Sequence, residues 1–129
     1  MFIVDRTTFE SLVSRGVENL PKIYRDKINN IAFIVEDLPS QQQRVQLELA
    51  NNQTLFGLYE GVPLPQRQGS LKIIPDKITI FQLPIQSSVD NMEQLYDQVA
   101  RTVWHEVAHY FGLDHEMIDK LNNRSKKTR

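Results

Sequence analysis

The sequence contains no cysteine at all, and it has few glycines and few histidines. Without cysteine there is neither a disulfide framework nor a thiolate metal site, so histidine and carboxylate are the only strong ligands left for a transition metal. The absence of cysteine also suits the cytoplasm, which is the location we expect. No apolar run approaches the roughly 20 residues of a membrane span, so we expect no membrane partner.

The sequence also has no excess of positive or of negative side chains. The 129 residues include 15 basic and 16 acidic side chains. This balance lacks the electrostatic field of a nucleic-acid-binding protein, so we expect no nucleic-acid partner. Charged residues begin at Asp5 and Arg6, too early for a secretory signal peptide, and we therefore expect a soluble, unprocessed protein.

The length of the chain predicts one small domain. About 100–150 residues is the usual size of a domain with one core, and we expect this one to span residues 1–121. The basic segment 122–129 has the composition of a disordered tail. We expect the domain to be α+β, with a short mixed or antiparallel sheet packed on a long helix.

The first third of the chain predicts a helix followed by a strand. Thr7 or Thr8 can cap a helix that runs to about Asn19, because apolar residues recur on one face of this segment. Residues 31–35 are mostly β-branched or aromatic and are followed by a turn, which is the pattern of a buried strand. We expect this strand to be the central one of the sheet.

Two further strands are expected at residues 55–59 and 77–81, because each apolar run is bounded by glycine or proline. Residues 63–69 indicate a loop between them. The glutamine-rich stretch 41–52 has only a weak alternation, which fits either an edge strand or an irregular excursion.

The longest uninterrupted pattern lies near the C-terminus, where no glycine or proline occurs between Asp90 and Gly112. Asp90 and Glu93 fit a capping box, so a helix of about six turns should begin there. Two apolar rows predict that this helix is buried over much of its circumference. The rows are Met92, Leu95, Val99, Val103 and Val107, and Ala100, Trp104, Ala108 and Phe111. The remaining sector carries Gln98, Arg101, Thr102, His105, Glu106 and His109.

All three histidines of the chain fall within eleven residues, in the pattern His105-Glu106-x-x-His109-x-x-Gly112-x-x-His115. This pattern should arise by chance at roughly one start position in ten million. Positions four apart on a helix differ by about 40° in angle and about 6 Å in height, so His105 and His109 can bind one ion. The spacing therefore predicts a metal site rather than a coincidence on a surface helix.

His115 can join the site only if the helix stops before it. A continuing helix would turn His115 about 240° away from His109, whereas Gly112 can adopt the left-handed conformation that ends a helix. Three neutral imidazoles would leave one position of a tetrahedral zinc ion open to water, as in catalytic zinc sites. Glu106, adjacent to the first ligand, is then the natural general base.

This pattern resembles that of the zincin metallopeptidases, and the third histidine resembles the metzincin version of the motif. The chain departs from the metzincins because only fourteen residues follow His115, too few for their downstream Met-turn. Over residues 31–121 the sequence is similar instead to the minimal zincin-like bacterial metallopeptidases, a family of compact α+β domains with one zincin helix. The likeness lies in residues 55–64 with Arg67, in residues 75–81 and in residues 102–116.

The resemblance implies that His105 and His109 are metal ligands, that Glu106 is the general base and that residue 115 supplies the third ligand. Many members of the family carry aspartate where this chain has His115. A third imidazole in that place favours zinc as the metal, because imidazole is a typical zinc ligand.

We therefore expect a zinc-dependent metallopeptidase in which Glu106 and zinc activate a water for attack on a peptide bond. Its substrate would be a peptide or an unfolded protein, lying beside residues 78–81 if that strand edge is exposed. Two alternatives stay open: a non-catalytic, zinc-stabilised binding module, and a zinc amidase acting on a non-peptide substrate. Asp114 or Glu116 could also replace His115 as the third ligand.

Other notable side chains near the motif have plainer interpretations. We interpret the aromatic ones, Tyr59, Trp104 and Tyr110, as residues of the core or of the site wall. Arg67 fits a solvated loop residue better than a ligand for a substrate carboxylate or an oxyanion. Arg101 fits a member of a helix-surface ion pair better than a substrate contact.

Overall fold

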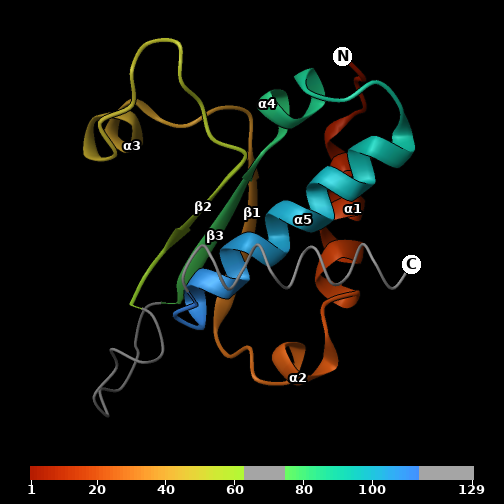
Figure 1. Cartoon of the computed structure of the whole chain (residues 1–129), viewed down its shortest axis with the longest axis vertical. Helices are drawn as coiled ribbons and strands as arrows, with labels where there is room; N and C mark the ends of the chain where they lie inside the picture. The colour runs from red at the N-terminus through yellow and green to blue at the C-terminus, as the bar shows by residue number, and fades with distance from the viewer. Residues whose placement is uncertain (63–74, 114–129) are drawn as a thin grey trace.

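The computed structural model describes residues 1–62 and 75–113. The elements follow one another as α1 (Arg6–Glu18), α2 (Lys22–Arg25), β1 (Ile31–Glu36), α3 (Gln41–Gln46), β2 (Gly57–Glu60), β3 (Asp76–Phe81), α4 (Gln82–Ser87) and α5 (Met92–Tyr110). The three strands form one small mixed sheet, and α5 crosses it while packing on α1 (Figure 1). The prediction of an α+β domain with a short sheet on a long helix is confirmed. The predicted loop 63–69 and tail 122–129 lie outside the described residues.

β3 is the central strand of this sheet. It pairs in parallel with all six residues of β1 and antiparallel with all four residues of β2. Ile78 and Ile80 of β3 are fully buried, whereas the apolar residues of β1 are only half-buried. The prediction that residues 31–35 form the central strand is therefore wrong, because an apolar, β-branched run reports burial of a strand's faces and not the number of its partners.

The strand order leaves β1 and β2 as the edges of the sheet among the described strands. Residues 78–81 have a neighbour on both sides, so the backbone edge that we expected a substrate to use is already occupied. β2 is the edge strand that contacts α5.

Local side-chain caps decide where the first helices begin. Asp5, and not Thr7 or Thr8, caps α1, and its carboxylate accepts a hydrogen bond of 2.7 Å from the backbone N–H of Thr8. Ser40 and Gln43 form a complete capping box at the start of α3. The stretch expected as an edge strand or an irregular excursion therefore begins with a helix, because two satisfied backbone donors outweigh a weak alternation.

α4 is a short helix that the sequence did not predict. It follows β3 without a connecting loop, and Pro84 lies in its first turn, where the missing N–H has no intrahelical partner to lose. Gln86 of α4 is buried and accepts a hydrogen bond of 2.9 Å from the backbone N–H of Val4. This contact fixes the N-terminal segment against α4.

α5 has the extent and the burial that its apolar rows predict. It begins one residue later than expected, because Asn91 is the cap and accepts a hydrogen bond from the backbone N–H of Gln94. Most residues of the two rows are buried against α1 and the sheet, whereas Met92 in the first turn is exposed. No helix within the described residues is both long enough and apolar enough to span a membrane.

Candidate metal centre

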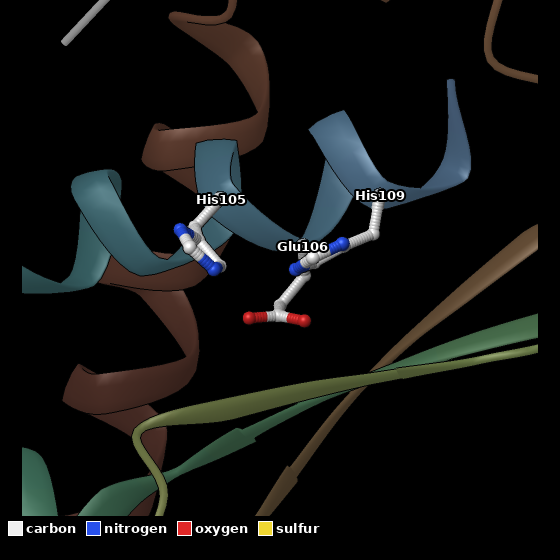
Figure 2. Close-up of side chains that lie close together, drawn as sticks. All are labelled: His105, Glu106 and His109. Atoms are coloured by element: carbon white, nitrogen blue, oxygen red, sulfur yellow. The ribbon is translucent and has the colours of Figure 1, made fainter. Parts of the chain in front are cut away.

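His105 and His109 lie one turn apart on α5 and project from the same side of it (Figure 2). The centroids of their rings are 4.8 Å apart, and the ring planes meet at 75°. Both side chains are half-buried. The potential ligand atoms of His105, Glu106 and His109 all lie within 4.8 Å of one another. The fold thus brings together the two imidazoles and the carboxylate that the motif predicts.

Glu106 leaves the helix between the two imidazoles and points toward the sheet (Figure 2). Its side chain is buried, and its Oε1 accepts a hydrogen bond of 3.0 Å from the backbone N–H of Tyr59. Burial raises the pKa of Glu106 from 4.5 to about 7, although the Tyr59 N–H acts in the opposite direction. A carboxyl with this pKa can both accept and return a proton near neutral pH.

The N–H that Glu106 engages belongs to the outer edge of β2. The backbone N–H of Phe81 donates to the carbonyl of Phe56 at 2.8 Å, so Phe56 faces β3. Along an antiparallel strand, the backbone N–H and C=O groups of successive residues point alternately toward the partner strand and away from it. The backbone groups of Gly57 and Tyr59 therefore point away from β3. The Glu106 carboxyl thus joins α5 to the outer edge of the sheet.

Gly57 allows β2 to approach α5 this closely. A Cβ at this position would lie 2.7 Å from Thr102 Cγ2 and 3.1 Å from Glu106 Cγ, and the first of these distances is far inside van der Waals contact. A larger residue would therefore push the strand away from the helix or rotate Glu106. The sequence alone did not reveal this role, because it does not show which helix residue faces Gly57.

The side chain of Tyr59 is fixed by contacts with β3 and α5. Its hydroxyl donates a hydrogen bond of 2.8 Å to Oδ2 of Asp76, which is buried at the start of β3, and its ring packs edge-on against Tyr110. Trp104 is buried in the core against Tyr24. Tyr59, Trp104 and Tyr110 therefore support the site, in line with their plainer interpretation.

Gly112 ends α5 as the motif predicts. Its φ of 75° is left-handed, its N–H donates to the carbonyl of His109 at 2.9 Å, and the N–H of Leu113 donates to the carbonyl of Ala108 at 3.0 Å. These two bonds form the Schellman arrangement that closes a helix and turns the chain off its axis. The residues considered for the third ligand lie outside the described residues, as does Arg67; they are Asp114, His115 and Glu116.

A groove of about 500 Å³ opens beside the two imidazoles, on the side of His105. One wall is the segment 54–57, which leads into β2. The other wall is a stripe of α5, formed by Gln98, Arg101, Thr102, His105 and Glu106. The candidate site therefore has adjoining space for a ligand larger than a metal ion.

The donor atoms of the site fit a zinc ion. Imidazole nitrogen is a preferred zinc ligand, and two such nitrogens on a tetrahedral zinc lie about 3.3 Å apart. The ligand atoms here lie within 4.8 Å of one another, so small side-chain rotations bring His105 and His109 to that separation. The Glu106 carboxylate lies between the imidazoles and the sheet (Figure 2), and the Tyr59 N–H engages one of its two oxygens, Oε1.

A family model described as zincin-like metallopeptidase matches residues 28–124. The fold is similar to that of a conserved hypothetical protein from Thermo thermophilus, with a TM-score of 0.56 and 17% sequence identity, over 93% of this chain and 99% of the other. No curated protein matches the sequence.

Proposed function

The chain belongs to the zincin-like metallopeptidase family, and we propose that it is a cytoplasmic peptidase that hydrolyses peptide bonds with a bound zinc ion. The observation that carries this proposal is the position of Glu106, a buried carboxyl between two imidazoles. A purely structural metal site needs no such group. A hydrolase does, because it has to move a proton from water to a leaving amine.

His105, His109 and His115 would hold the metal. The first two occupy one side of α5, and the turn at Gly112 supplies the change of direction that a third ligand from the following segment requires. When bound, zinc would polarise the carbonyl of the scissile bond and lower the pKa of a water molecule. Asp114 and Glu116 remain the alternatives to His115.

Glu106 would act as the proton carrier. Its Oε1 stays with the Tyr59 N–H, so Oε2 is the atom that takes the proton of the attacking water. The same proton then passes to the nitrogen of the leaving amine, which restores the carboxylate for the next cycle. In the metal-free protein burial raises the pKa of Glu106 to about 7, and a bound zinc ion would lower it again and favour the carboxylate that accepts the proton.

The substrate would be an extended peptide or an unfolded protein segment. On the outer edge of β2, Gly57 has backbone groups that point away from β3 and would pair with a peptide, and the groove beside His105 offers space for side chains. We propose no nucleic-acid or membrane partner, since the net charge is near zero and the sequence has no long apolar run.

The test is metal content and peptide hydrolysis of the tag-free protein. We expect about one zinc per chain by elemental analysis, with loss of the metal in His109→Ala and His115→Ala. Glu106→Gln should keep the zinc and lower the rate of hydrolysis by about 10²–10⁴-fold. Full hydrolysis by the Glu106→Gln protein would overturn the assignment of the base.

A second candidate function is a zinc-stabilised module that binds peptides without cleaving them. It is favoured by one observation, namely that Glu106 joins α5 to the edge of β2, a contact that serves the fold without any turnover. Zinc-dependent peptide binding with no product over long incubation would support this function over the peptidase.

A further inference from the structure

Arg101 lies in the groove beside the candidate metal centre. It shares the groove-lining stripe of α5 with His105, one turn further along, and the segment 54–57 forms the opposite wall. Among the described residues that line the groove, Arg101 is the one with a permanent positive charge. Glu106, next to His105, is the acidic residue among them.

The guanidinium of Arg101 has no ion-pair partner in the part of the chain that the structure describes. The ion pairs there join Arg6 to Asp37, Lys77 to Glu60 and the N-terminal amine to Asp90. The helix-surface ion pair expected for Arg101 is therefore not formed within residues 1–62 and 75–113. An exposed arginine that faces a groove without a partner can bind a carboxylate with two parallel hydrogen bonds.

The direction of a bound peptide follows from the contacts between α5 and β2. Gly57 lies against Thr102, and the next outward-facing residue, Tyr59, lies against Glu106, so the two elements run in the same direction. We take the peptide to add antiparallel to β2, because antiparallel pairing is slightly more stable per residue than parallel pairing, and it then runs from Tyr59 toward Gly57. Its C-terminal part therefore lies on the Arg101 side of the imidazoles.

The distance along the helix limits which substrate residue can reach Arg101. Arg101 precedes His105 by four residues, which is about 6 Å along the helix axis. An extended peptide advances about 3.3 Å per residue. With the scissile carbonyl at the imidazoles, the partner of Arg101 belongs to the first or second residue after the scissile bond.

We propose that Arg101 makes the site selective for peptides with a carboxylate on the first or second residue after the scissile bond. This inference rests on the proposed peptidase function and adds the substrate class. The carboxylate has two sources: an aspartate or glutamate side chain, or the terminal carboxylate of a peptide that ends there. Arg101 is a specificity residue in this proposal and takes no part in moving protons.

The first test compares matched peptides on the full-length, zinc-loaded protein. In one pair, the two peptides differ by Glu or Gln at the first or the second residue after the scissile bond. In the other pair, both peptides end at that residue, one with a free terminal carboxylate and one with a terminal amide. We expect kcat/KM to be about five- to tenfold higher with the carboxylate. Arg101→Gln should remove this preference, and Arg101→Glu should reverse it. The pair that shows the preference identifies the source of the carboxylate.

Lys22→Gln is the matched control, because it removes one positive charge from an exposed position in α2, outside the groove. We expect it to keep the full preference for the carboxylate. An equal loss in Lys22→Gln and Arg101→Gln would show a general effect of charge and overturn the proposal. The same preference in Arg101→Gln as in the unaltered protein would also overturn it.

A binding measurement separates this inference from the proposed function. Fluorescence anisotropy with the same peptides on the Glu106→Gln protein, with zinc and after chelation, needs no turnover. We expect the protein to bind the carboxylate peptides more tightly even without metal. We expect this preference to disappear in the double variant that carries both Glu106→Gln and Arg101→Gln. If the unaltered protein cleaves no peptide but this preference is found, the peptidase function fails and the role of Arg101 stands. No preference in either measurement would overturn the role of Arg101.

Discussion

Glu106 has to satisfy two conditions that oppose each other. A general base should be ready to ionise near neutral pH, yet burial between α5 and β2 disfavours the charged form. The backbone N–H of Tyr59 offsets only part of that cost, so the pKa of Glu106 is raised to about 7. In the metal-free protein the ionised carboxyl is therefore a source of instability.

This cost predicts how stability depends on pH. Because the pKa of Glu106 is higher in the folded protein than in the unfolded chain, its favourable contribution is complete below about pH 4.5 and is lost as pH rises through about 7. We expect metal-free Glu106→Gln to be more stable than the unaltered protein by about 1–3 kcal/mol at pH 8 and by little at pH 5. Urea denaturation with a chelator across this range measures it, and parallel pH profiles for the two proteins would contradict it.

Gly57 gives a second prediction for a single residue. Gly57→Ala places a Cβ 2.7 Å from Thr102 Cγ2, so the strand or Glu106 must move. We expect a loss of about 1–3 kcal/mol in the free energy of unfolding, together with at least a tenfold loss of hydrolysis. Denaturation curves and kcat/KM measure the two effects.

Gly16→Ala is the matched control for this substitution. Gly16 lies within α1, and a Cβ there would approach Ala100 Cα and Val103 Cγ2 no closer than 3.4 Å. Its stability should stay within about 1 kcal/mol of the unaltered protein, because the gain in helix propensity offsets the tight contact. Equal losses in both variants would mean that the contact of Gly57 with Thr102 is not the cause.

At the scale of the element, the two ends of α5 serve different purposes. Asn91 at the start stabilises the helix alone, whereas Gly112 at the end also sets the direction in which the chain leaves the two imidazoles. Losing either should cost a similar amount of stability. Only the loss of the second should affect the metal.

We therefore predict a difference between Gly112→Ala and Asn91→Ala. Each should lower the free energy of unfolding by about 1 kcal/mol, since one strains a left-handed residue and the other removes a cap. Gly112→Ala should in addition weaken zinc binding about tenfold or more, because it disturbs the approach of the third ligand. Competition with a chromophoric chelator measures the affinity. Equal zinc affinities in the two variants would argue against a ligand beyond Gly112.

For the whole molecule, the core is built without the metal ligands. The buried apolar residues of α1, β3, α4 and α5 form one cluster, whereas His105 and His109 are only half-buried. Folding should therefore not depend on zinc, in contrast to small domains that are unfolded without their metal.

Removal of the metal tests this independence. After chelation we expect the circular dichroism spectrum to stay that of a folded α+β protein, and we expect Tm to fall only by the amount that zinc binding contributes through mass action. Cooperative loss of structure on chelation would contradict this and would favour the zinc-stabilised binding module over the peptidase.

The sequence by itself determined the parts of this protein that depend on local spacing. The helical repeat predicts α5 with its apolar rows and places His105 and His109 on one side of it. The end of the helix at Gly112 follows from the ability of glycine to adopt a positive φ. The family followed from the same motif.

The tertiary structure decided what depends on residues far apart in the chain. Three features arise where distant segments meet. They are the central position of β3 in the sheet, the hydrogen bond from the Tyr59 N–H of β2 to Glu106, and the groove that contains Arg101. Residues 47 apart in the sequence, Tyr59 and Glu106, make the hydrogen bond that holds the proposed base. Periodicity reports which face of an element is buried, but strand order, edges and the surroundings of a carboxyl are properties of the packed molecule.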